Sequence, residues 1–457
     1  MKRRHFLKTL GCGAIGSAAL ASGFDRLLLT NAMAASTTPT DYKALVCIFL
    51  LGGNDANNTV VPLEPAEYAS YAAIRGGLAL TQTELLPIQP ARNGGSYGLH
   101  PGLIRLHQLW QQGKLGIAAN LGTLVEPMSR EQYQTRSVKV PYQLFSHSDQ
   151  QQSWQTANAS ISSPLGWGGQ IADLVLDTAG NFPPVISVAG VSAFCRGQRN
   201  KPMVLPAAPA ALNKALVLEH PGDMAASSMF RQLLDHGGAP KSPVLVRDIS
   251  QIISSAVSQS EALSEDPLIN TPFPASNSLG NQLKQVAKLI KFAPSVGLKR
   301  QVFFCALGGF DTHNNQGAAT GSHADLLSDL SEAMGAFYDA TVELGVASQV
   351  TSFTLSDFNR TLKPGGSGTD HAWGGHQFIL GDAIAGGELY GAFPTMALDG
   401  PNDADRGANA RGRWIPTLAV EQYAATLASW FGISAGDLPL IFPNLGNFNT
   451  PNLGFFR

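Results

Sequence analysis

Three apolar runs, each followed by a glycine or serine and then an aspartate, constrain the fold of this chain more than any other feature. The runs and the acids that follow them are Lys43–Leu51 with Asp55, Gln301–Leu307 with Asp311, and Gln349–Leu355 with Asp357. Runs that are rich in Val, Ile, Phe and Thr and do not alternate with polar residues are typical of strands buried on both faces. They predict an α/β fold with a mostly parallel central sheet flanked by helices.

Periodic apolar residues elsewhere predict the helices that cover this sheet. The candidate helices are Gly102–Gln112, Pro164–Leu176, Asp248–Leu263, Asn281–Phe292, His323–Leu344 and Val420–Phe431. At the start of His323–Leu344, the pair Ser322 and Asp325 resembles a capping box. We expect residues 195–292, which contain Pro/Ala-rich loops and helical runs, to form a partly helical insertion or a cap.

The overall composition excludes several classes of protein. The 457 residues include 31 Lys+Arg and 33 Asp+Glu, and they are 14% charged and 44% hydrophobic. A disordered chain is more charged and less apolar, and a nucleic-acid binder carries a basic surplus. We therefore expect a globular protein without a nucleic-acid partner. Beyond residue 34 the cysteines are Cys47, Cys195 and Cys305, an odd number that argues against a disulfide framework.

The first 34 residues have the pattern of an export signal. Arg3–Lys8 contains a twin arginine and precedes the weakly apolar, Gly/Ala-rich run Thr9–Leu20. That run is too short for the roughly 30 Å of a membrane's hydrocarbon core, and no later segment offers an apolar span. We expect cleavage before Ala35, a single mature domain over residues 35–457, export by the twin-arginine translocase, and a soluble periplasmic or secreted protein.

The acids that follow the strands predict a ligand site. In open α/β sheets ligands gather at the carboxyl ends of the strands, where Asp55, Asp311 and Asp357 are expected. The pentapeptide Leu-Gly-Gly-x-Asp begins at both Leu51 and Leu307, and paired glycines allow tight turns behind each acid. The alternative is that each aspartate only caps a turn.

Five of the ten histidines lie close to these segments, and they suggest a metal site. They are His147, His313, His323, His371 and His376. Imidazoles combined with carboxylates suit a divalent transition metal, with zinc or manganese the better match, whereas calcium would leave the imidazoles unused. For His371 and His376 the alternative is a Gly-rich surface loop that happens to contain polar residues. One or two ions are expected.

Ser146 stands before a polar run that begins a predicted helix. Backbone N–H groups at a helix N-terminus favour an anionic nucleophile or a bound oxyanion, so Ser146 is a candidate nucleophile. The alternative is an ordinary serine N-cap.

Several segments together resemble the twin-arginine-exported bacterial family known as domain of unknown function 1501, which is placed in the alkaline phosphatase and sulfatase superfamily. The resemblance extends over nearly all of the mature chain. The segments that carry it are Leu51–Pro62, Tyr97–Pro101, Ser146–Gln150, Gly166–Gly168, Gly308–His313, Ser356–Thr361, Gly368–His371 and Tyr423–Phe448.

The resemblance implies one or two metal ions held by Asp and His at strand ends, with a nucleophile that attacks a phosphate or sulfate ester. Carried over residue by residue, it makes Ser146 the nucleophile. The metal ligands that it implies are Asp55, Asp311, His313, Asp357, His371 and His376. Arg360 either holds the anion with two hydrogen bonds or forms a structural salt bridge.

Two departures from the superfamily's pattern affect the expected chemistry. Phe358 stands where the superfamily often has a histidine, so one imidazole must come from elsewhere or a second metal site is incomplete. The sequence also lacks the Cys/Ser-x-Pro-x-Arg motif of formylglycine sulfatases, which favours phosphate esters over sulfate. The expected function is an exported metal-dependent ester hydrolase acting on an anionic ester. The alternatives are a non-catalytic exported binding or assembly protein and a metal-free serine esterase, which lacks the expected Gly-x-Ser-x-Gly motif.

Overall fold

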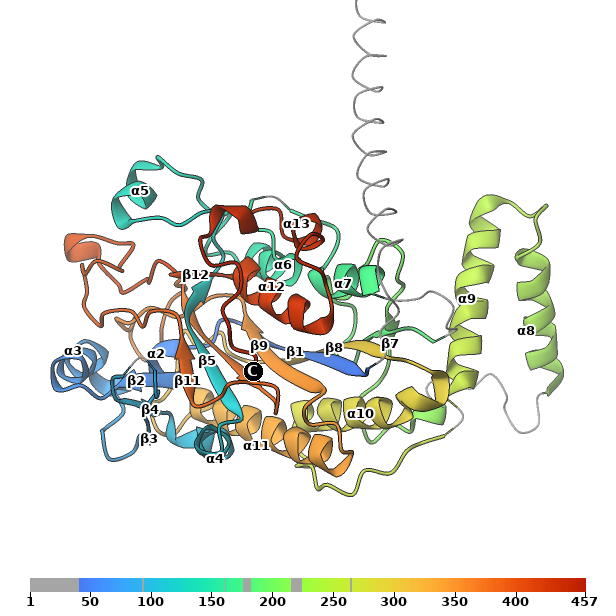
Figure 1. Ribbon diagram of the computed structural model, residues 1–457, viewed down its shortest axis with the longest axis horizontal. Coiled ribbons are helices and arrows are strands. Elements are labelled where there is room, and N and C mark those ends of the chain that lie inside the picture. Colours follow the sequence, from blue (N-terminus) through green and yellow to red (C-terminus); the bar gives the residue numbers. More distant parts are fainter. Residues whose placement is uncertain (1–40, 93, 161, 176–181, 215–223, 264) are drawn as a thin grey trace, which may run out of the picture.

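The computed structural model describes residues 41–457 except 93, 161, 176–181, 215–223 and 264 (Figure 1). The predicted twin-arginine segment and its cleavage site lie outside the described residues. Within the described part, none of the helices combines the length and the apolar character that crossing a membrane requires. Cys47, Cys195 and Cys305 are buried and free.

A central sheet organises the fold, and nine strands of the described chain belong to it. Eight lie in the order β11-β5-β10-β9-β1-β8-β6-β7, and β12 also pairs with β5. The strands are β1 (Lys43–Leu51), β5 (Leu115–Gly122), β6 (Val185–Ser187), β7 (Met203–Val204), β8 (Arg300–Gly308), β9 (Val350–Ser356), β10 (Gly375–Leu380), β11 (Glu388–Tyr390) and β12 (Leu418–Ala419). Only the pairings of β10 with β5 and β9 are antiparallel, so the predicted, mostly parallel sheet is confirmed.

The three predicted strands lie side by side at the centre of the sheet. β1 pairs in parallel with β8 on one side and β9 on the other. Leu51 is opposite Gly308, and Leu50 is opposite Ser356, so the three strands end at the same level. The loops that carry Asp55, Asp311 and Asp357 therefore leave the same edge of the sheet.

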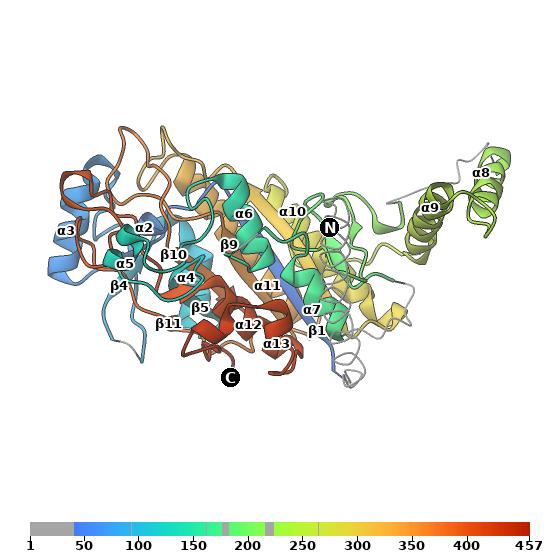
Figure 2. The same cartoon turned by 90° about the horizontal axis from the view of Figure 1, so that it is seen from above.

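Helices cover both faces of the sheet (Figures 1 and 2). One face carries α4 (Ile104–Gln111), α10 (Ser278–Phe292) and α11 (Ser322–Glu343). The other carries α6 (His147–Thr156), α7 (Trp167–Val175), α12 (Val420–Phe431) and α13 (Leu438–Ile441). A small antiparallel sheet of β2 (Val60–Pro62), β3 (Leu86–Ile88) and β4 (Tyr97–Leu99) lies at one end, and α2 (Ala56–Thr59) and α3 (Pro65–Arg75) pack on its strand β2. The helix α5 (Arg130–Thr135) lies apart from this sheet (Figure 1).

Successive residues of β1 point into two different cores. Val46, Ile48 and Leu50 pack with α4, α10 and α11, whereas Cys47 and Phe49 pack with α7, α12 and α13. This double burial explains why the run Lys43–Leu51 is apolar at almost every position.

The helices of residues 195–292, the expected insertion or cap, lie in two different parts of the molecule. α8 (Met224–Gly237) and α9 (Val244–Ala262) pack on each other and project beyond β7 (Figures 1 and 2). In contrast, α10 packs between β8 and α11 as part of the main helical layer. The predicted capping box of α11 is wrong, because Gly321 is the N-cap and Ser322 donates to the carbonyl of Asn315.

Candidate metal centre

Two glycine turns lock together behind the candidate site. Gly52 has φ +114°, and a Cβ at this position would lie 2.4 Å from the backbone nitrogen of Asp311. The Phe310 N–H donates to the carbonyl of Leu51 at 3.1 Å. Only glycine permits both this backbone conformation and this close approach. The turn after β1 therefore holds the turn after β8, and with it the Asp311 side chain.

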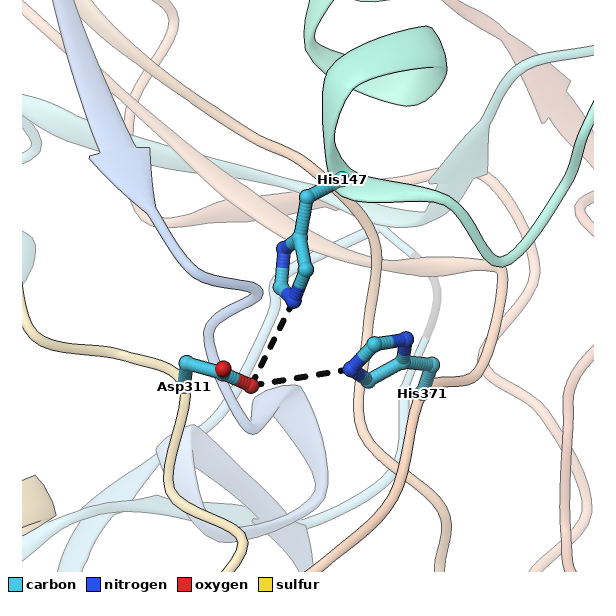
Figure 3. Close-up of side chains that lie close together, drawn as sticks. All are labelled: His147, Asp311 and His371. Carbon is cyan, nitrogen blue, oxygen red and sulfur yellow. Dashed lines mark ion pairs between the residues drawn. The ribbon is translucent and has the colours of Figure 1, made fainter.

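Three imidazoles converge on the carboxylate of Asp311 (Figure 3 shows two of them). The Asp311 Oδ1 atom lies 3.1 Å from His313 Nε2, 3.4 Å from His147 Nε2 and 3.6 Å from His371 Nε2. His313 Nε2 and His371 Nε2 are 3.0 Å apart. A metal ion with bonds of about 2.0–2.1 Å separates neighbouring tetrahedral ligand atoms by about 3.3 Å. The ligand atoms of His147, Asp311 and His371 all lie within 4.8 Å of one another, close enough to hold a metal ion. These three side chains together with His313 form the Asp311 cluster.

Hydrogen bonds orient two of the imidazoles with their Nε2 atoms toward this cluster. His147 Nδ1 lies 2.7 Å from Asp357 Oδ2, and His371 Nδ1 lies 2.8 Å from the carbonyl oxygen of Phe145. A carboxylate and a carbonyl can only accept, so Nδ1 carries the proton in both rings. In the neutral rings Nε2 then has a free lone pair, the arrangement that orients histidine ligands in metal sites.

Two buried polar atoms, one in the cluster and one beside it, fit a bound cation. His147 Nε2 and Asp357 Oδ1 are buried and have no hydrogen-bond partner within the part of the chain that the structure describes. Buried polar atoms without a partner are rare and mark a missing ion or water. The cluster is also accessible, because the side chains of Asp311 and His313 are 48% and 43% exposed. The donor set of imidazoles and carboxylates suits zinc or manganese.

Electrostatics at the cluster favour an ionised Asp311. Burial alone would raise the pKa of Asp311, but the hydrogen bond from Arg360 and its positive charge lower that pKa below its usual value. The hydrogen bond to Asp357 raises the pKa of His147, whereas burial lowers the pKa of His371. His147 therefore holds a proton more tightly than His371 does, and a metal ion has to displace that proton to bind His147.

Asp357 and Arg360 both position the ligands. Asp357 is fully buried and accepts from His147 and, at 2.9 Å, from Gln151 Nε2. Arg360 is also fully buried, and each of its three nitrogens donates to the protein. Its acceptors are the carbonyls of Gly52, Gly53, Phe310 and Thr369 and the Asp311 carboxylate. The structural salt bridge expected as one alternative for Arg360 is present, with Asp311 as the partner. The other hydrogen bonds of Arg360 go to main-chain carbonyls.

Asp55 lies apart from the cluster, although it follows β1 as predicted. It is fully buried, forms an ion pair with Arg75, and accepts from Gln316 Nε2 at 2.5 Å. Burial would raise the pKa of Asp55, but Arg75 outweighs burial and lowers it. Its oxygens thus stabilise the turn and the N-terminus of α2, and the structure does not bring them to the imidazoles.

His376 and His323 are also separate from the cluster. His376 is buried in β10, accepts the N–H of Asn120 at 3.2 Å and stacks on Phe393. His323 lies 2.9 Å from Asn54 Oδ1 through its Nε2 atom. Burial lowers the pKa of both imidazoles to about 3, so both rings are neutral parts of the packed interior.

Ser146 is the residue before His147 and occupies the N-cap position of α6, but its side chain makes no capping hydrogen bond. Its hydroxyl donates to Asp149 Oδ2 at 2.5 Å and lies 3.2 Å from Ser148 Oγ. Ser146 is therefore not an ordinary N-cap serine, because its Oγ bonds to a carboxylate and not to a backbone N–H.

Sequence reasoning missed two residues of this region. His147 is one of the five histidines that suggest a metal site, but it is not among the ligands that the resemblance implies, and nothing in its spacing connects it to Asp311, 164 positions later. Asp370 forms a second possible ligand group with His313 and His371. Its position directly before His371 was the only available signal.

The fold and this cluster define an α/β protein with a candidate metal centre at the carboxyl ends of its central strands. Residues 42–404 match the family model described as Protein of unknown function (DUF1501), and the chain belongs to this family. A comparison with curated proteins found no match.

Several solved structures are similar to the chain at low identity. The soluble domain of lipooligosaccharide phosphoethanolamine transferase A from Neisseria meningitidis is 9% identical, with a TM-score of 0.35 over 93% of this chain and 97% of that chain. Lipoteichoic acid synthase LtaP from Listeria monocytogenes is 7% identical, with a TM-score of 0.31 over 90% and 79%. The PsFucS1 sulfatase from Pseudoalteromonas sp. is 7% identical, with a TM-score of 0.30 over 82% and 69%. Scores this low assign no activity to this chain.

Proposed function

We propose that this protein is an exported, metal-dependent hydrolase of phosphate or sulfate esters, with the superfamily plan that its motifs resemble. The observation that carries the proposal is the convergence of three histidine Nε2 atoms on Asp311 Oδ1 at 3.1–3.6 Å. The four ligands are His147, His313, His371 and Asp311. Export by the twin-arginine translocase to the periplasm or beyond is part of the proposal and rests on Arg3–Lys8.

The metal ion would polarise the ester oxygens and favour the deprotonated form of a coordinated hydroxyl group. Ser146 supplies that hydroxyl in our proposal, since it adjoins His147 at the start of the ten-residue helix α6. Its proton passes to Asp149, which already accepts from it at 2.5 Å. Ser146 Oγ bonds to the phosphorus or sulfur as the alcohol leaves, and water then releases the inorganic anion.

A second candidate is a non-catalytic exported protein that binds metal for an assembly or binding role. One observation favours it: the two side chains expected to act on an ester already have protein partners. Ser146 donates to Asp149, and Arg360 donates to main-chain carbonyls and to Asp311. The test must therefore separate metal binding from hydrolysis.

Metal content and hydrolysis should be measured on protein purified from its exported form. The substrates are an aryl phosphate, an aryl phosphodiester and an aryl sulfate. We expect at least one zinc or manganese ion per chain, its loss in Asp311→Asn, and hydrolysis that falls about a thousandfold in Ser146→Ala with the metal retained. Ser434→Ala is the matched control, because Ser434 makes the same hydrogen bond to an aspartate three positions on, at an exposed turn.

The outcomes separate the candidates. Bound metal without hydrolysis of any ester in the wild type supports the second candidate. A chain that carries no metal and shows equal background rates in all variants contradicts both.

A further inference from the structure

A pocket with a positive charge lies next to the Asp311 cluster. It has a volume of about 380 Å³, and its walls include Lys363, Arg411, Arg413 and Asp405. Part of one wall is the Gly-rich turn that starts at Pro364, which the Asp311 cluster does not use. The pocket walls carry three cationic side chains and the Asp405 carboxylate, and Asp370 beside the pocket lies 3.6 Å from Arg411 Nη1 and 3.7 Å from Arg413 Nη2. Three positive charges outnumber these two carboxylates, so the pocket favours anions.

The backbone brings this pocket and the metal ligands into contact. The segment 359–363 lies between two others: Thr361 N–H donates to the carbonyl of Asp370 at 2.9 Å, and Lys363 N–H donates to the carbonyl of Arg411 at 3.0 Å. Arg360 and His371 form an antiparallel bridge. Lys363 is therefore only two residues from Thr361, which bonds to Asp370, the residue directly before the candidate ligand His371.

Arg413 forms the boundary between the two sites. Its Nε donates to the carbonyl oxygen of His371 at 2.9 Å, and its guanidinium lies 4.9 Å from the centre of the Phe145 ring. The same Phe145 accepts from His371 Nδ1 through its carbonyl. Asp405 holds the other side of the guanidinium at 3.4 Å. This cation is fixed in place and orients the metal ligand from behind.

The remaining two cations are available to a ligand. Lys363 and Arg411 are exposed. Arg411 Nη1 lies 3.6 Å from Asp370 Oδ2, too far for a hydrogen bond, and its side chain is 47% exposed. Arginine and lysine together can supply charge-assisted hydrogen bonds to a phosphate, sulfate or carboxylate group.

We propose that this pocket binds a second anionic group of the substrate, so that the substrate is an ester carrying at least two anionic groups. The ester group occupies the Asp311 cluster, and the other anion lies between Lys363 and Arg411. Asp370, which approaches His313 at 4.0 Å and Arg411 at 3.6 Å, stands between the two positions. The substrate class rests on the proposed hydrolase function, whereas the anion site does not.

Binding to metal-free protein tests the anion site by itself. Calorimetric titration with inorganic pyrophosphate at constant ionic strength should show binding to the chelator-treated wild type. The double variant Lys363→Gln with Arg411→Gln should bind pyrophosphate at least about tenfold more weakly, because two charge-assisted hydrogen bonds are lost. Arg406→Gln is the matched control, since Arg406 is an exposed arginine of the same loop outside the pocket. No binding, or equal binding by the double variant, overturns the anion site.

A pair of substrates tests the substrate class on the metal-loaded protein. Phenyl phosphate has one anionic group, and para-carboxyphenyl phosphate has two. We expect a KM about tenfold lower for the second compound in the wild type and no preference in the double variant. Equal KM values in the wild type overturn the inference about the substrate. Pyrophosphate binding without hydrolysis of either ester, or of the aryl phosphodiester and the aryl sulfate, contradicts the hydrolase function and leaves the anion site standing.

Discussion

At the scale of single residues, the candidate metal ligands are oriented without the metal. His147 and His371 each donate Nδ1–H to an acceptor that belongs to the protein, Asp357 Oδ2 in one case and the Phe145 carbonyl in the other. Arg360 fixes the third component, the Asp311 carboxylate. A site that is already arranged loses little conformational entropy on binding, which favours tight coordination.

The contact between Asp357 and His147 predicts an effect on metal affinity. Asp357→Asn keeps the shape of the side chain but removes the carboxylate that orients the ring and makes Nε2 more basic. We expect zinc affinity to fall about 10–100-fold, measured by competition with a chromogenic chelator. Asp382→Asn is the control, because Asp382 bonds to Lys114 and Tyr338. Unchanged affinity in Asp357→Asn would contradict the positioning role.

The ion pair between Asp55 and Arg75 predicts an effect on stability instead. Both side chains are fully buried, so Asp55→Asn leaves the Arg75 charge without compensation. We expect the free energy of unfolding to fall by about 3–5 kcal/mol in urea titrations. Metal content per folded chain should stay the same, since Asp55 lies outside the Asp311 cluster.

A double variant keeps this prediction testable if the single variant fails to fold. Asp55→Asn combined with Arg75→Gln removes both charges and should recover part of the lost stability. Loss of metal from the folded double variant would show that Asp55 is a ligand after all.

The sequence predicted that three strands, each followed by an aspartate, end at one edge of the sheet, but it did not separate candidate ligands from supporting residues. Asp55, Asp311 and Asp357 occupy equivalent places after β1, β8 and β9, and the pattern treats them alike. Their roles differ because of distant partners: Arg75 pairs with Asp55, and His147 bonds to Asp357. Such pairings depend on packing between segments far apart in the chain, which neither spacing nor periodicity encodes.

At the scale of elements, the strand assignments succeeded because burial on both faces leaves a continuous apolar run. The prediction for the run Lys43–Leu51 matches β1 at both ends. The predicted N-cap of α11 was Ser322, one residue later than the observed N-cap, Gly321. Gly321 has φ +114° and precedes the helix without a side-chain cap. Helix ends depend on such local contacts more than helix centres do.

The interlocked turns at the ends of β1 and β8 give an element-scale prediction. Gly52→Ala places a Cβ against the backbone of Asp311 and imposes a positive φ on alanine. We expect a loss of about 1–3 kcal/mol in the free energy of unfolding and weaker zinc binding, because Asp311 must shift. Chemical denaturation and the chelator competition measure the two effects.

Gly308→Ala is the matched control for this prediction. Gly308 is the last residue of β8 and belongs to the equivalent glycine pair, but nothing lies within 4 Å of a Cβ at this position. The variant should change zinc affinity little. Equal effects of the two substitutions would contradict the close approach of the two turns.

At the scale of the whole molecule, the last part of the chain covers one face of the sheet. The family match ends at residue 404, yet α12 and the segment after it contribute Tyr423, Phe431, Phe442 and Phe455 to the core that contains β1. Arg411 and Arg413 of the anion pocket belong to this part too. The centre of the sheet and the proposed substrate pocket thus both depend on the C-terminal region.

Glu421 ties this region together and predicts a pH dependence of stability. Its buried carboxylate accepts two hydrogen bonds from Asn444, from the backbone N–H at 2.8 Å and from Nδ2 at 2.6 Å. Burial is the larger effect and raises the pKa of Glu421 from 4.5 to about 7. The folded state therefore holds this proton more tightly than the unfolded state, so the contribution is complete below pH 4.5 and is lost as the pH rises to about 7.

Glu421→Gln removes this titration. The stability of the variant relative to the wild type should rise with pH between 4.5 and about 7, by on the order of 3 kcal/mol in total. Urea unfolding of both proteins across this pH range measures the difference. Glu343→Gln is the control, since Glu343 is an exposed carboxylate at the end of α11 whose pKa is lowered to about 2 by hydrogen bonds from Thr271. A constant difference between the Glu421 variant and the wild type over this range would mean that Glu421 is ionised in the folded protein throughout, and that its contacts with Asn444 outweigh its burial.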